Sequence, residues 1–298
     1  MRERAGAKFR SQARDAIAPL PLSQADKRLL DRLKRFSRKG DWDGVESAFS
    51  SYKGNSSQIY SQVMHAAFRC GRYQRGVAVY NNLCAMGLPK NLPVFTLATK
   101  LFAKAGDTVL VRKTWAEALE TNAMDVPLAG ARIDAAAEEG DIVSAATVLD
   151  NMTKQKLQPN LAHFTSAVRA CVSAEGVSHN AANFLLRKVE EQGLAPELIF
   201  FTALIKSYTH ADLGNFTAAY QKMKDFGIEP DRVFAETYLG TLLQPNTKGV
   251  SMLEALQGTD PSVLAAAREA LQDFEAANVE LSGLCRSVQR ALGRILDM

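Results

Sequence analysis

Apolar residues recur at helical spacing along most of the chain, in pairs of short segments. Residues 198–231 show the plan most clearly, because two apolar stripes flank a short polar stretch. The apolar positions are Phe201, Leu204, Ile205 and Tyr208 in the first stripe and Phe216, Ala219, Tyr220 and Met223 in the second. The stretch then closes on GIEPD at 227–231, whose glycine and proline are typical of a helix end. The pattern predicts two short helices joined by a tight turn.

Earlier parts of the chain repeat this plan at a nearly constant interval. An aromatic residue opens four units, at Tyr60, Phe95, Phe164 and Phe201, and Ala129 takes this slot once. The intervals are 35, 34, 35 and 37 residues, and related turn phrases close the units at 83–91, 152–160, 189–197 and 223–231. A period in this range predicts hairpins that bury their apolar faces only against their neighbours. We therefore expect an all-α fold, a right-handed α-solenoid of stacked helix-turn-helix hairpins.

The repeat register divides the chain into four parts. Residues 1–22 are a basic arm, and residues 23–56 are a shortened capping hairpin that begins at Ser23. Five full units are predicted at 57–91, 92–125, 126–160, 161–197 and 198–231. In residues 232–298 the register blurs, and we expect a degenerate repeat with Val233, Tyr238 and Leu242 on its apolar face, followed by capping helices. The alternative for these last helices is a docking surface for a partner protein.

The five units resemble pentatricopeptide repeats, which open with an aromatic and a small polar residue and close on a Gly-apolar-x-Pro-Asp phrase. The tetratricopeptide repeat is the nearest alternative, but its Trp/Leu-Gly/Tyr pattern is missing from these units. The resemblance implies a non-enzymatic protein of a chloroplast or mitochondrion that binds single-stranded RNA, one base per repeat. The RNA would lie on the concave face lined by the first helices.

In that family the residue after the aromatic slot reads the base, and the last residue of the unit supports the contact. Carried onto this sequence, the pairs are Ser61 with Asn91, Thr96 with Asp125, Gly130 with Asn160, Thr165 with Glu197, and Thr202 with Asp231. The resemblance implies adenine for the first pair and guanine for the second and the fifth. Gly130 has no side chain to read a base, and Glu197 is an uncommon partner. The alternative for each residue is an ordinary polar residue in the first turn of a helix.

The positive charge lies at the amino-terminal end. The first 40 residues carry twelve Lys and Arg against four Asp and Glu, whereas the whole chain has a net charge of only +4. The arm has two interpretations, the remnant of an organellar targeting segment or a basic arm that binds nucleic acid. Within the repeats, Arg69 and Lys104 are the best candidates for phosphate contacts, and the matching position in the next unit is Glu138. So few groove charges predict weak RNA binding at physiological salt.

The sequence offers no catalytic, metal or cofactor motif. Cys70, Cys84, Cys171 and Cys285 lack paired spacing, and we expect them to be small buried thiols in a reducing compartment. No apolar run approaches the roughly 18 residues of a membrane span. Two hypotheses remain: an organellar RNA-binding protein for transcript processing, stability or translation, and a structural subunit of an organellar ribonucleoprotein such as the ribosome. In the second, the basic arm contacts ribosomal RNA and the repeats contact proteins.

Overall fold

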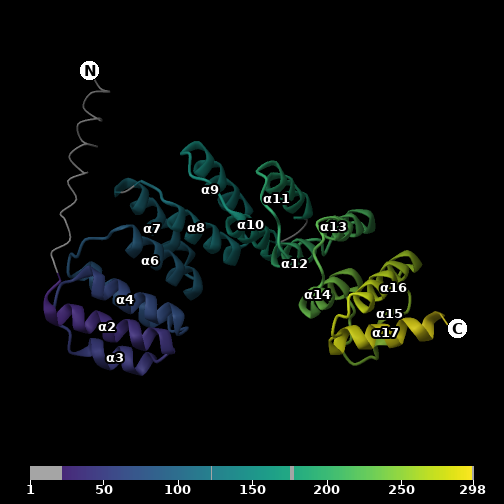
Figure 1. The fold of residues 1–298 in the computed structure, drawn as a ribbon, viewed down its shortest axis with the longest axis horizontal. Coiled ribbons are helices and arrows are strands. Elements are labelled where there is room, and N and C mark those ends of the chain that lie inside the picture. The colour runs from purple at the N-terminus through teal and green to yellow at the C-terminus, as the bar shows by residue number, and fades with distance from the viewer. Residues whose placement is uncertain (1–21, 122, 175–177, 297–298) are drawn as a thin grey trace, which may run out of the picture. The chain divides into compact units, whose positions relative to one another are not determined.

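The apolar stripes fold into helical hairpins, as their spacing predicts. A computed structural model describes residues 22–121, 123–174 and 178–296, and this part of the chain contains helices and no strands (Figure 1). The predicted basic arm lies almost entirely outside the described residues. The first helices of the hairpins are α2 (Gln24–Lys39), α4 (Ser57–Arg69), α6 (Leu92–Ala105), α8 (Val126–Glu139), α10 (Leu161–Ser173), α12 (Leu198–Lys206) and α14 (Arg232–Leu243). The second helices are α3 (Trp42–Ser50), α5 (Tyr73–Ala85), α7 (Thr108–Thr121), α9 (Ile142–Lys154), α11 (His179–Glu191) and α13 (Leu213–Asp225). The chain continues through α15 (Met252–Leu256), α16 (Pro261–Ala276) and α17 (Gly283–Leu296).

Short polar residues begin these helices and glycines end several of them. The Ser23 hydroxyl accepts the Asp26 N–H at the start of α2, and Asp212 accepts the Asn215 N–H at the start of α13. These bonds satisfy backbone donors that have no partner within the helix. At the other end, Gly106 adopts φ +78°, a left-handed conformation that a side chain disfavours.

The described residues form two compact units. Unit 1 contains the described residues up to Ala135 together with Lys154–Leu157, and unit 2 contains Ala136–Thr153 and the residues from Gln158 onward. In unit 1, α4 packs against α2, α5 and α6, around a core that includes Leu33, Val45 and Met64. The core therefore runs through successive hairpins, as a repeat fold requires.

Unit 2 has the same hairpin packing and ends in an aromatic cluster. Helix α12 packs against α10 and α14, and α14 packs against α16 and α17. The ring centroid of Tyr238 lies 4.8 Å from those of both Phe216 and Tyr220, and 5.9 Å from that of Phe274. Because Phe274 belongs to α16, the last helices cover the apolar end of the preceding hairpins, as expected of a cap.

Some expectations for single side chains are wrong. Val233 is 63% exposed and lies outside the core, because it occupies the free side of the first turn of α14. Tyr208 is buried as expected but lies beyond the end of α12, in the turn. Cys171 and Cys285 are buried, whereas Cys84 is exposed and Cys70 half-buried. Burial raises the pKa of the Cys171 thiol to about 11, which makes it unreactive near neutral pH. None of the described helices has the length and apolar character needed to cross a membrane.

Candidate nucleic-acid interface

The predicted base-reading residues occupy equivalent positions in successive first helices. Each lies five residues after the residue that begins its helix, so Thr96, Thr165 and Thr202 follow Asn91, Asn160 and Glu197 respectively. An α-helix has about 3.6 residues per turn, so residues at the same distance from the start of their helices point in the same direction relative to that start. Within each unit, the predicted base-reading residues therefore lie on the same side of successive first helices.

The predicted support residues begin the first helices, and four of the five are engaged there. The side-chain Oδ1 accepts a backbone N–H three residues later, at 3.2 Å for Asn91, 2.9 Å for Asp125, 3.3 Å for Asn160 and 2.7 Å for Asp231. Glu197 makes no such bond, because its longer side chain does not fit this geometry. Capping uses one side-chain atom, so the second oxygen or nitrogen of the group is left for another partner.

Thr202 and Asp231 lie together in an open pocket of unit 2. The pocket has a volume of about 610 Å³ and is lined by residues of α10, α12 and the start of α14. Ile199 and Val233 lie on its walls and are 69% and 63% exposed, respectively. Each of these apolar side chains is the second residue of its helix. The pocket thus combines a hydroxyl and a carboxylate with two exposed apolar side chains.

Two cations complete the lining, and neither was among the residues predicted to bind RNA. Arg169 and Lys206 both lie nine residues after the residue that precedes their helices, Asn160 and Glu197, so they occupy equivalent positions in α10 and α12. Arg169 forms an ion pair with Glu138 at 3.3 Å, which offsets part of its charge. Lys206 is exposed and also lines an adjoining depression of about 600 Å³ with Arg232 and Thr237. The recurrence of a basic residue at this register position is a sequence signal that would have found both.

In unit 1 the predicted phosphate-binding residues belong to a basic region of α4 and α6. Arg69 and Lys104 are both exposed. Burial, together with the charges of Arg69 and Lys100, lowers the pKa of His65. Lys100 occupies the register position of Arg169 and Lys206, so a cation recurs at this position in both units, whereas His65 takes the position in α4.

Comparison with known proteins agrees with this geometry. The sequence model of the pentatricopeptide repeat domain matches residues 147–211, from within α9 to the turn after α12. Residues 147–211 are therefore similar to the pentatricopeptide repeat domain. No curated protein sequence matches it.

Solved structures share the repeat fold at low sequence identity. Two crystal structures of the pentatricopeptide repeat protein PPR10 in complex with an 18-nt psaJ RNA element match with a TM-score of 0.64 and 16% identity. They cover 99% of this chain, which spans only 43% of the PPR10 chain. A tetratricopeptide repeat protein from Parabacteroides merdae matches with a TM-score of 0.53 and 14% identity, over 91% of this chain and 98% of that protein. These likenesses show an all-α solenoid of helical hairpins.

The repeats differ in how well they present their base-reading residue. The Thr165 hydroxyl donates to the Leu161 carbonyl at 2.9 Å, and the Thr202 hydroxyl donates to the Leu198 carbonyl at 2.8 Å, so both retain lone pairs that can accept a bond. The Thr96 hydroxyl is buried and has no hydrogen-bond partner among the described residues. Ser61 is half-buried. Thr202 with Asp231 is therefore the best-formed of the predicted pairs.

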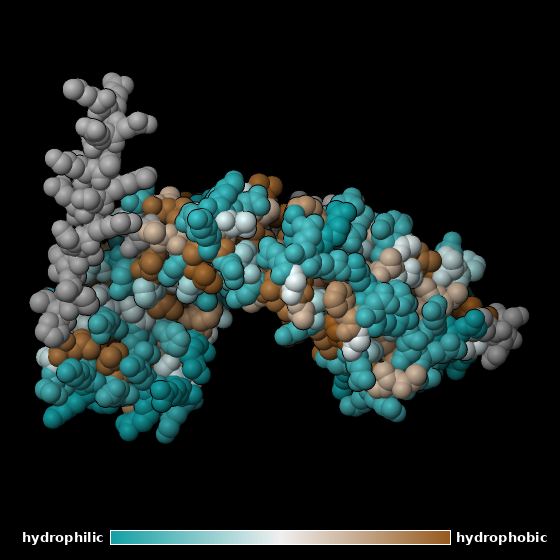
Figure 2. All heavy atoms as spheres, turned by 45° about the horizontal axis from the view of Figure 1, so that its top comes forward, coloured by the Kyte–Doolittle hydropathy of each residue, from teal (hydrophilic) through white to brown (hydrophobic). Residues whose placement is uncertain are grey.

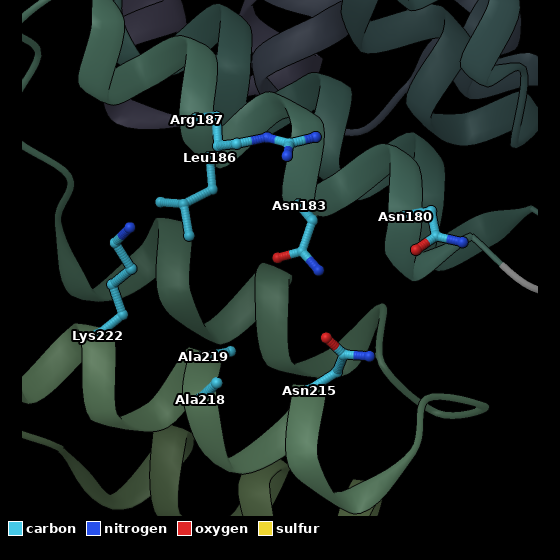
Figure 3. A pocket seen from close by; sticks show the side chains of 8 residues that line it. All are labelled: Asn180, Asn183, Leu186, Arg187, Asn215, Ala218, Ala219 and Lys222. Carbon is cyan, nitrogen blue, oxygen red and sulfur yellow. The ribbon is translucent and has the colours of Figure 1, made fainter.

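A different pocket lies between the second helices of neighbouring repeats in unit 2. Figure 3 shows Asn183 and Arg187 of α11 facing Asn215 and Lys222 of α13 across a space of about 490 Å³. Its polar groups are largely engaged within the protein, because Asn183 accepts the Tyr208 hydroxyl and Lys222 pairs with Glu190 at 2.7 Å. It is the packing groove between two repeats. Across the described residues, no three His, Cys, Asp or Glu side chains gather as a metal-binding group.

Proposed function

We propose that this chain binds single-stranded RNA through the side of the first helices that carries Thr202 and Asp231, without catalysing a reaction. The observation that carries the proposal is the pocket between α12 and α14. The Thr202 hydroxyl, the Asp231 carboxylate, two exposed apolar side chains and the Lys206 ammonium line this one open depression. The PPR10 structures, which share the fold and hold an RNA element, support the proposal.

The chemistry of the pocket favours a base with hydrogen-bond donors on its edge. One oxygen of Asp231 accepts the Phe234 N–H, so the other is left as an acceptor. A carboxylate offers only acceptors, and guanine presents N–H donors at N1 and N2, which matches the guanine implied for this pair. Ile199 and Val233 are placed to pack on the two faces of the base, and Lys206 to contact a phosphate.

The proposed binding is weak and depends on salt. Outside the first 40 residues the chain carries more acidic than basic residues, so few cations are available to replace counterions on the RNA. A few readable bases also select many sites in a transcript pool. The role that we propose, in organellar transcript processing, stability or translation, therefore needs a second source of affinity.

The same charge distribution favours a second candidate function. An acidic repeat region preceded by a basic end suits a structural subunit of an organellar ribonucleoprotein, in which the repeats contact proteins. The two functions differ in whether the isolated chain binds single-stranded RNA at low salt. A chain that binds none would favour the structural role.

The direct test removes the Thr202 hydroxyl in the full chain. Thr202→Val keeps the shape of the side chain and deletes one hydrogen-bonding group, so we expect about 2- to 12-fold weaker binding, the loss typical of one hydrogen bond. Binding is measured by fluorescence anisotropy at low salt, with a labelled single-stranded RNA in which guanines recur among uridines.

A matched control is available in a second helix. The Thr217 hydroxyl of α13 donates to the Leu213 carbonyl at 2.9 Å, which is the same local bond as that of Thr202, but Thr217 lies outside the pocket. Thr217→Val should leave RNA binding unchanged. Equal losses in the two variants, or no loss in either, would contradict the proposed site.

A further inference from the structure

The outer side of α2 carries an unusual concentration of cations. All seven of its Lys and Arg residues are exposed, against only two Asp. These cations are Lys27, Arg28, Arg32, Lys34, Arg35, Arg38 and Lys39. At 3.6 residues per turn they fall within an arc of about 160°, opposite the side that buries Leu33 in the core of unit 1. We call this arc the basic face of α2; the hairpin of α2 and α3 lies at the lower left of Figure 1, and its surface is mostly hydrophilic in Figure 2.

Helix stability does not account for this arrangement. The helix dipole favours Arg38 and Lys39 in the last turn of α2 but disfavours Lys27 in the first turn. Like charges also repel four residues apart, and Arg28 and Arg32 form one such pair. Lys34 with Arg38 and Arg35 with Lys39 add two more pairs. A capping helix needs only a polar outer side, so mixed charges would solvate it equally well.

The charges of the basic face are not neutralised within the described residues, where none of the seven cations forms an ion pair. Asp26 accepts the Ser23 hydroxyl at 2.8 Å, and Asp31 is the one exposed acid within the arc. On the neighbouring helix α3, Glu46 pairs with Arg75 at 3.5 Å. The basic face therefore presents an uncompensated positive potential to solvent.

We propose that the basic face of α2 binds the phosphate backbone of double-helical RNA. This rests on the proposed function, because it assumes that RNA is the ligand, and it supplies the additional affinity that the weakly charged repeats need. Proteins that bind single strands without sequence preference combine a positively charged groove with exposed aromatic side chains on which bases stack. Here the one aromatic residue of α2, Phe36, is half-buried, and the Arg35 guanidinium lies 5.8 Å from its ring centroid.

Duplex RNA, by contrast, is recognised mainly through its shape and its phosphates. A 16-residue helix is about 24 Å long, so cations placed along it reach several phosphates of a stem. The contacts carry no sequence information. The basic face of α2 thus suits a duplex stem of any sequence.

The test compares two triple variants of the full chain that remove the same charge. Arg28→Gln/Arg32→Gln/Arg35→Gln alters the basic face, and Arg286→Gln/Arg290→Gln/Arg294→Gln alters an exposed ridge of arginines on α17. For a blunt RNA duplex, we expect the α2 variant to bind about tenfold more weakly at low salt. The slope of log affinity against log salt should become shallower by about 2.7, which is three phosphate contacts. The α17 variant should bind duplex like the wild type.

Parallel measurements separate the other outcomes. Far-UV circular dichroism verifies the fold, and Arg28→Lys/Arg32→Lys/Arg35→Lys should retain duplex binding because the charges remain. Equal losses in both Gln variants, unchanged duplex binding in the α2 variant, or α2-dependent binding to phosphatidylserine vesicles without binding to duplex would each overturn the proposal. Single-stranded RNA is measured alongside, so a failure of the pocket at Thr202 is seen independently of α2.

Discussion

At the residue scale, the Asp231 side chain has a structural role in the fold and a second role in the proposed function. Its Oδ1 begins α14 by accepting the Phe234 N–H at 2.7 Å, while the group lines the pocket that contains Thr202. The sequence predicted both interpretations of this residue, a helix cap and a support for base reading. The structure shows that they are compatible, because a carboxylate has two oxygens.

Two substitutions separate these roles of Asp231. Asp231→Asn keeps a capping oxygen and replaces the second acceptor by an N–H₂ donor, so we expect unchanged stability and a shift in preference from guanine towards adenine. Asp231→Ala removes both roles and should cost about 1 kcal/mol of stability as well as RNA affinity. Urea denaturation and anisotropy with guanine- and adenine-containing RNAs measure the two effects. An Asn variant that keeps the wild-type base preference would show that Asp231 only caps the helix.

At the element scale, the hairpins were predictable because apolar stripes recur at helical spacing and several helices have a capping residue at the start or a glycine at the end. Ser23 caps the hairpin that it was predicted to begin, and Asp212 and Asp260 likewise accept backbone N–H groups at the starts of α13 and α16. Less predictable was which apolar residues remain exposed. Helical periodicity marks Val233 as apolar on an amphipathic helix, but burial depends on whether a neighbouring repeat covers that side. Only the packing of neighbouring repeats shows that the exposed side chains of Val233 and Ile199 line a pocket.

Glycines at the helix ends test the hairpin geometry. Gly106 and Gly140 both have positive φ, 78° and 68°, but their surroundings differ. A Cβ at Gly106 would meet no atom within 4 Å, so Gly106→Ala should cost only the backbone strain, about 1–2 kcal/mol.

At Gly140 an added Cβ would lie 2.6 Å from the Ser173 carbonyl oxygen, where the next repeat approaches. Gly140→Ala should therefore destabilise the protein more than Gly106→Ala does, which chemical denaturation of the two variants will measure. Equal losses would contradict the close approach between these repeats.

At the scale of the whole molecule, sequence reasoning located the repeats more readily than the charge that serves them. The sequence predicted phosphate contacts at Arg69 and Lys104, near the ends of their helices. Lys206 and Arg169 were missed although a basic residue recurs at their register position, because the pocket that gives this recurrence its meaning is formed by residues of three first helices. From the sequence, Arg28, Arg32, Arg35 and Lys39 of α2 were interpreted as the solvated outer side of a cap, because a sequence does not show that they form no ion pair with the other described residues.

The most direct measurement is the salt dependence of single-stranded RNA binding by the full chain and by Lys206→Gln. We predict that the wild type binds at low salt, and that the slope of log affinity against log salt becomes shallower by about 0.7 in the variant, the value for one phosphate contact on a single strand. Failure of the wild type to bind at low salt, or identical slopes for the two proteins, would contradict an RNA interface on the side of the first helices that carries Thr202 and Asp231.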